Sequence, residues 1–207
     1  MQAKICGVKD KKTLKYIVSH SCAPKFIGFI CNYKKSKRFL QFNKLQNLLT
    51  INKRKSKYVA VLVRPNKSEL KKFSLLPFDY FQIYDIGANE LRLIKKEYKI
   101  KIIAAITINE KKDVLKYNEY KNIADIVLFD SKGYEKSMSF DHKLIKNLRT
   151  KKKIMLGGNI QVDDELESYK KITDIIDISG GLETSGLKDV SKINIFLKKI
   201  KLINNEN

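Results

Sequence analysis

The segment YVAVLV at residues 58–63 is apolar at every position and contains several β-branched residues. A strand that faces water on one side alternates apolar and polar residues, whereas a strand covered on both faces is apolar throughout. Parallel strands joined by crossover helices are covered in this way. The segment therefore predicts a buried strand in a parallel α/β sheet.

Seven other short segments share this apolar character and lie on both sides of it along the chain. They are AKICGV (3–8), KFIGFI (25–30), FDYFQI (78–83), KIIAAI (101–106), ADIVLF (124–129), KIMLGG (153–158) and DIIDIS (174–179). Amphipathic stretches between them predict helices. The clearest lie behind a cap at Asp10 (Leu14, Ile17, Val18), over Phe42, Leu45, Leu48 and Leu49, after Ser68 (Leu70, Phe73), and over Val190, Ile193, Phe196, Leu197 and Ile200.

Eight strand-and-helix units without a second block of different composition predict one closed α/β barrel, a (β/α)8 TIM barrel with short loops. We expect it to occupy residues 1–207 as a single domain, with a tail that frays from about residue 203. The alternative is an open doubly wound sheet, which more often has five or six strands.

The chain is strongly basic, with a formal net charge of +21, but its cations do not form a patch. They are spread over every segment, with modest runs at 52–57 and 149–153, and lysine far outnumbers arginine. Base recognition and two-pronged phosphate contacts favour arginine. The composition therefore predicts no nucleic-acid partner.

Cysteine and histidine usage argues against a disulfide framework and against a metal site. The chain has three cysteines, Cys6, Cys22 and Cys31, without metal-ligand spacing, and two histidines, His20 and His142. Reduced thiols, the lack of a signal pattern at the start and the absence of an apolar run long enough to span a bilayer predict a cytoplasmic protein without a membrane partner.

In a TIM barrel the residues that do chemistry stand at the carboxyl ends of the strands. Glycine pairs follow the seventh predicted strand (Gly157, Gly158) and the eighth (Gly180, Gly181, after Ser179). Backbone N–H groups at such glycines can close on an anion, although either pair alone could simply permit a sharp turn. Two pairs on neighbouring strands favour a phosphate site.

Cys6 and Asp130 end the first and sixth predicted strands. Taken alone, Cys6 could be an inert core residue and Asp130 a helix cap. Together at one rim they suit a base and an acid that act on a small substrate, as an isomerase requires.

Five segments, taken in order and spacing, resemble the phosphoribosylanthranilate isomerase family of tryptophan biosynthesis. They are KICGVKD (4–10), GFICNYKKSKR (28–38), DIVLFDS (125–131), LGGNI (156–160) and IDISGGLETSGLKD (176–189). The resemblance extends from about residue 3 to about residue 200. Each motif alone is weak, but the ordered set is specific.

The resemblance implies a cofactor-free Amadori rearrangement of N-(5'-phosphoribosyl)anthranilate to 1-(o-carboxyphenylamino)-1-deoxyribulose 5-phosphate. It implies that Asp130 protonates the furanose ring oxygen and that Cys6 removes the C2 proton. For these roles the pKa of the Asp130 carboxyl must be raised, and the Cys6 thiol must have a lowered pKa or be deprotonated by its surroundings. It further implies that Arg38 holds the anthranilate carboxylate, for which a planar guanidinium is suited. The remaining residues matched to substrate binding are Gln82, Gly157, Gly158, Ser179, Gly180 and Gly181. A monomer is favoured over a homodimer.

Several positions depart from the family pattern. The strand-four motif QLHG is QIYD here, with Tyr84 and Asp85 in place of histidine and glycine. The loop KGYEKSMSFDH (132–142) keeps only Gly133, Phe140 and Asp141 of a glycine-rich stretch, and Ala104 and Leu156 replace the usual lysine and alanine. These changes bear on rate and substrate preference more than on fold. Two alternatives stay open: a related phosphosugar isomerase or epimerase, and a catalytically silent basic barrel that serves as a scaffold or associates with RNA.

Overall fold

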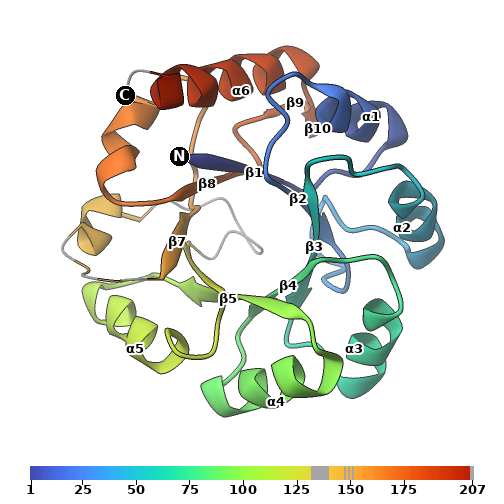
Figure 1. The fold of residues 1–207 in the computed structure, drawn as a ribbon, viewed down its shortest axis with the longest axis vertical. Coiled ribbons are helices and arrows are strands. Elements are labelled where there is room, and N and C mark those ends of the chain that lie inside the picture. Colours follow the sequence, from blue (N-terminus) through green and yellow to red (C-terminus); the bar gives the residue numbers. More distant parts are fainter. Residues whose placement is uncertain (132–139, 147, 149, 151, 206–207) are drawn as a thin grey trace.

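The computed structural model describes residues 1–205 except 132–139, 147, 149 and 151. Eight parallel strands form a closed barrel in which each strand pairs with its sequence neighbours and β8 pairs with β1 (Figure 1). The strands are β1 (Gln2–Cys6), β2 (Phe26–Ile30), β3 (Lys57–Val63), β4 (Tyr80–Tyr84), β5 (Lys101–Thr107), β6 (Ile126–Asp130), β7 (Lys153–Leu156) and β8 (Ile175–Ile178). The predicted TIM barrel is confirmed, and the alternative of an open doubly wound sheet is excluded.

The helices cover the outside of the barrel (Figure 1). They are α1 (Lys11–Ser19), α2 (Phe42–Leu49), α3 (Lys67–Ser74), α4 (Ala88–Tyr98), α5 (Tyr117–Tyr120) and α6 (Val190–Asn205), with 3₁₀ turns η1 (Lys111–Lys116), η2 (His142–Ile145) and η3 (Leu166–Lys171). A short hairpin, β9 (Glu183–Thr184) and β10 (Leu187–Lys188), follows β8. None of the helices in the described ranges has the length and apolar character needed to cross a membrane.

Strand β3 explains why a continuous apolar run was a good predictor. Its side chains alternate between two hydrophobic clusters: Val59, Val61 and Val63 fill the barrel interior, while Tyr58 and Leu62 pack outward beneath the helices. Both faces of the strand are thus removed from water, so neither face needs polar residues. The inner cluster fills the barrel beneath the cavity at its carboxyl-end rim.

Two helix ends are defined by contacts in the structure. Helix α3 begins at Lys67, ahead of Ser68, and is capped by Asn66, because the Asn66 side chain accepts from the Glu69 N–H and Glu69 accepts from the Asn66 N–H. Helix α6 continues through Asn205, where Ile203 is buried and Asn204 bonds to Met1; fraying of the tail stays a prediction.

We expect Asn66→Ala to lower the free energy of unfolding by about 1 kcal/mol, because it removes the side-chain acceptor of a capping box. Urea denaturation would measure the change. The matched control is Ser68→Ala, an exposed position two residues further along, which should change the free energy by less than about 0.5 kcal/mol. Equal effects of the two substitutions would contradict the assigned cap.

Candidate active site

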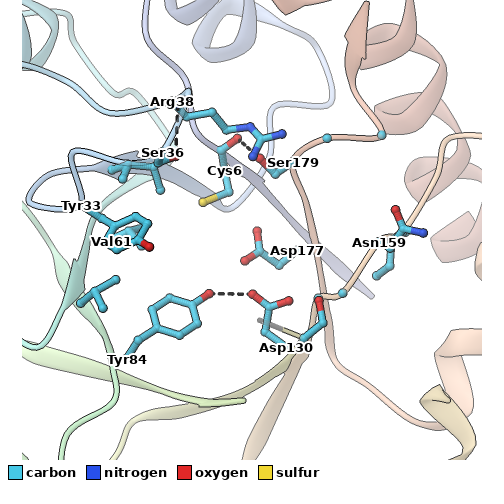
Figure 2. A pocket seen from close by; sticks show the side chains of 18 residues that line it. Cys6, Tyr33, Ser36, Arg38, Val61, Tyr84, Asp130, Asn159, Asp177 and Ser179 are labelled. Atoms are coloured by element: carbon cyan, nitrogen blue, oxygen red, sulfur yellow. Dashed lines mark hydrogen bonds between the residues drawn. The ribbon is translucent and has the colours of Figure 1, made fainter. Parts of the chain in front are cut away.

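A cavity that opens to solvent lies at the carboxyl-end rim of the barrel (Figure 2). Its wall brings together most of the site residues predicted from the sequence, namely Cys6, Arg38, Asp130, Gly157, Gly158, Ser179, Gly180 and Gly181. Figure 2 shows the Cys6 sulfur and the Asp130 carboxyl at the same cavity, with the Asp177 carboxyl between them in this view. The geometric condition for an acid and base pair at one rim is therefore met.

Asp130 is the last residue of β6 and is only 9% exposed. Its Oδ2 accepts a hydrogen bond of 2.7 Å from the Tyr84 hydroxyl. Burial raises the pKa of Asp130 to about 6, even though the bond from Tyr84 acts in the opposite direction. The expected direction of this shift is confirmed, and the carboxyl can hold a proton near neutral pH.

Gly157 has a role that the sequence did not indicate. A Cβ at this position would lie 3.0 Å from Asp130 Oδ1 and 3.1 Å from Asp130 Cγ, which is tighter than normal packing. The glycine therefore makes room for the carboxyl of the neighbouring strand, in addition to any role in binding an anion. On the other side, an added Cβ at Gly158 would lie 3.0 Å from the ring of Phe140.

Cys6 ends β1 and is 8% exposed. Burial raises the pKa of the thiol, and the nearby Lys4 ammonium opposes that rise without cancelling it. The pKa of Cys6 is therefore not lowered, and a role as base requires that a neighbouring group stabilise the thiolate. A Cβ on Gly28 of β2 would lie 2.9 Å from the Cys6 sulfur and 3.2 Å from Lys4 Nζ, so sulfur and ammonium lie over the same glycine.

Sequence analysis missed an ion pair inside the barrel. Lys4 Nζ lies 2.7 Å from Asp177 Oδ2, and the two side chains are 0% and 7% exposed. Asp177 also lines the cavity, and its Oδ1 has no hydrogen-bond partner among the described residues. The available signal was a lysine and an aspartate inside otherwise apolar strands, since buried charges are retained when they are paired or functional.

Arg38 lines the cavity, but in this structure its guanidinium is engaged. It donates from Nε to Glu183 Oε1 (2.6 Å) and from Nη2 to Glu183 Oε2 (2.8 Å), and Lys188 Nζ donates to the same Glu183 Oε1 (2.7 Å). The hairpin of β9 and β10 thus reaches across to the loop after β2. Gly7, with φ of +75°, allows the approach, because a Cβ there would lie 2.4 Å from Arg38 Cδ.

The loops after β7 and β8 are held against each other at the rim. A Cβ on Gly181 would lie 2.3 Å from the Ile160 carbonyl oxygen, so only glycine fits there without a backbone shift. The Ser179 hydroxyl donates to the Cys6 carbonyl oxygen at 3.0 Å, which ties the end of β8 to the end of β1. The predicted glycine pairs therefore do meet at one wall of the cavity.

Gln82 does not line this cavity, unlike the other residues matched to substrate binding. It is fully buried on β4, and its Nε2 donates to the Tyr84 hydroxyl at 3.0 Å. Its place is therefore behind Tyr84, not on the wall. Of the altered loop after Asp130, Gly133 lies outside the described residues, while Asp141 caps η2 by accepting from the Lys143 N–H.

Comparison with known proteins gives one consistent family. The family model described as N-(5'-phosphoribosyl)anthranilate (PRA) isomerase matches residues 3–199. Proteins named N-(5'-phosphoribosyl)anthranilate isomerase are similar to this chain. That of Clostridium kluyveri is 29% identical over 205 residues, which cover 98% of this chain and 99% of the relative. That of Rhizobium johnstonii is 31% identical over 212 residues, which cover 97% of this chain and 94% of the relative. The crystal structure of phosphoribosyl anthranilate isomerase from Thermotoga maritima superposes with a TM-score of 0.85 at 22% identity, over 97% of this chain and 98% of that one.

We expect Lys4→Met to lower the free energy of unfolding by about 3–5 kcal/mol, because it leaves Asp177 charged, buried and unpaired. Adding Asp177→Leu should recover most of this loss. The control is Lys57→Met, which removes an exposed lysine paired with Asp79 at 3.3 Å and should cost less than about 1 kcal/mol. Urea denaturation measures all three, and a Lys4→Met loss no larger than the control would contradict a buried ion pair.

We expect Asp130→Asn to stabilise the protein at pH 8 but not at pH 3.5. A folded-state pKa of about 6 against a usual 3.8 means that the folded protein binds the proton more tightly, so stability falls as pH rises through that window. Removing the carboxyl should therefore raise the free energy of unfolding by about 3 kcal/mol above pH 6.

Asp79→Asn is the control of opposite sign. Hydrogen bonds from Lys53 and from the Tyr58 N–H outweigh burial and lower the pKa of Asp79, so that substitution should lower the free energy of unfolding at pH 8. Equal stability of Asp130→Asn and wild type at both pH values would contradict the raised pKa.

Proposed function

The chain belongs to the N-(5'-phosphoribosyl)anthranilate isomerase family and is an isomerase of tryptophan biosynthesis, and we propose that Cys6 and Asp130 are the base and the acid of its reaction. The reaction is the conversion of N-(5'-phosphoribosyl)anthranilate to 1-(o-carboxyphenylamino)-1-deoxyribulose 5-phosphate. The observation that carries the assignment is that Cys6, from β1, and Asp130, from β6, line one cavity beside the paired glycine loops.

Asp130 starts the reaction as the acid. With a pKa of about 6, roughly one molecule in ten carries the proton at pH 7, and the proton can be given to the furanose ring oxygen. The C–O bond of the ring then breaks, and the nitrogen lone pair forms an iminium ion. The positive charge makes the neighbouring C2 proton more acidic than it is in the closed sugar.

Cys6 then removes the C2 proton, giving an enolamine that tautomerises to the ketone. Burial disfavours the thiolate, but the Lys4 ammonium close to the sulfur stabilises it. The iminium ion supplies a second positive charge during the transfer. A thiolate that is costly to form is also a stronger base once formed, which suits abstraction from carbon.

The ends of the substrate would be held by two different walls. We propose that Arg38 exchanges the Glu183 carboxylate for that of the anthranilate, and that Gly157, Gly158, Gly180 and Gly181 receive the phosphate. The exchange is feasible because Glu183 keeps Lys188 as its partner and is not left unpaired. Gln82 supports this site from behind Tyr84. A monomeric state and a cytoplasmic location stay predictions.

Turnover of N-(5'-phosphoribosyl)anthranilate, generated in situ and followed by its loss of fluorescence, tests the roles. Cys6→Ser and Asp130→Asn should each lower kcat at least about 100-fold, because each removes a group that moves a proton in the reaction. Matched controls are Cys22→Ser, in the loop before β2, and Asp125→Asn, at the opposite end of β6, which should keep wild-type turnover.

Full activity in either Cys6→Ser or Asp130→Asn would contradict the roles assigned to those residues. A wild-type chain without turnover would contradict the proposed reaction itself. In that case the next measurements would be turnover of related phosphosugars and then RNA binding as a function of salt concentration.

A further inference from the structure

Tyr84 stands between two buried polar side chains at the rim. It is the last residue of β4, lines the cavity, and is buried. Its hydroxyl donates to Asp130 Oδ2 at 2.7 Å, a contact drawn as a dashed line in Figure 2. Gln82, two residues earlier on the same strand, donates from Nε2 to the Tyr84 oxygen at 3.0 Å.

The direction of these bonds fixes the orientation of the phenol. An amide NH₂ group can only donate, so Gln82 occupies a lone pair of the Tyr84 oxygen. The phenolic proton is then directed at Asp130 Oδ2. Burial, followed by the charge of Asp130, raises the pKa of Tyr84 well above its usual value, so the phenol stays neutral and remains a donor.

The two oxygens of Asp130 therefore have different surroundings. Oδ2 is committed to accepting from Tyr84, whereas Oδ1 lies on the side of Gly157, where a Cβ would come within 3.0 Å of it. Gly157 is part of the cavity wall at the end of β7. A proton added to this carboxyl is favoured on Oδ1, because a proton on Oδ2 would compete with the phenolic proton.

We propose that Tyr84 is a positioning residue for the acid: it reserves Oδ2 of Asp130 and so presents the acidic proton on Oδ1 at the Gly157 wall of the cavity. The inference rests on the proposed role of Asp130. It gives a function to one of the positions at which this chain departs from its family pattern, and it places Gln82 as the support of that tyrosine.

Other charged or titratable groups also face Asp130. They are Asp177 on β8 and Lys4 on β1, while Cys6 on β1 acts on Tyr84; the Ser131 backbone N–H also bonds to the Asp130 carboxyl. All of these groups are unchanged in a Tyr84→Phe variant, which deletes one oxygen and keeps the ring. A difference between that variant and the wild type therefore reports on the hydroxyl of Tyr84.

The first measurement needs no substrate. An infrared pH titration follows the protonated carboxyl band of Asp130, identified by its loss in Asp130→Asn. Tyr84→Phe removes a hydrogen bond to the charged form, so we expect the midpoint to rise by about one pH unit. The matched control is Tyr58→Phe, a buried tyrosine on β3 whose hydroxyl donates to the Ile51 carbonyl oxygen away from the cavity; it should leave the midpoint unchanged.

The second measurement is turnover at pH 5.5, where Asp130 is mostly neutral in both proteins and the two differ little in the amount of acid. Tyr84→Phe should lower kcat about tenfold, because the proton is no longer held on one oxygen, and should change KM less than about threefold, because the tyrosine positions the acid rather than the substrate. Tyr58→Phe should leave both values unchanged.

A raised midpoint together with the loss in kcat supports the proposal. An unmoved midpoint, or a raised midpoint with wild-type kcat, overturns the role of Tyr84 while leaving the proposed function intact. If Tyr84→Phe raises the midpoint but the wild-type chain shows no turnover, the proposed function is overturned instead. The two failures are therefore distinguishable.

Discussion

The ion pair between Lys4 and Asp177 crosses the seam at which the barrel closes. The two residues are register partners on β1 and β8, the first and last strands of the barrel, and both side chains point into the barrel interior. The pair therefore joins residues far apart in sequence and at the same time places a cation beside Cys6 and an anion near Asp130. Because a buried charge is tolerated only with its partner, this one contact both supports the pairing of β1 with β8 and sets the charges beside the cavity.

Desolvation shifts the pKa of Asp130 and of Cys6 in the same direction, which suits the proposed acid and opposes the proposed base. Burial favours the neutral form of both groups, which helps Asp130 to arrive with a proton and hinders Cys6 from losing one. Tyr84 and Lys4 moderate the two effects, since each supplies a donor or a charge to the ionised form. Both groups thus share one buried environment, which makes the Cys6 thiolate the less favourable of the two charged or protonated forms that the proposed reaction needs.

Glycine contributes to this site chiefly through the space that it leaves. At Gly157 the space is taken by the Asp130 carboxyl, at Gly7 by the Arg38 side chain, and at Gly181 by the Ile160 carbonyl. A motif that suggests anion binding when only the chain is considered is therefore also a packing requirement between neighbouring strands and loops. The hydrogen bonds between Arg38 and Glu183 also join the loop after β2 to the hairpin after β8.

From the sequence alone one can predict the eight strands, the closed barrel and the positions of Cys6 and Asp130 at one rim, because an all-apolar run and the end of a strand are local properties of the chain. The folded structure was needed to show that Gln82 lies behind Tyr84, that Arg38 is paired with Glu183, and that burial raises the pKa of Cys6. These outcomes depend on contacts such as Lys4 with Asp177, which are 173 residues apart, and on how much water the closed barrel excludes. Neither quantity is encoded in any short stretch of residues, since both arise when the last strand pairs with the first.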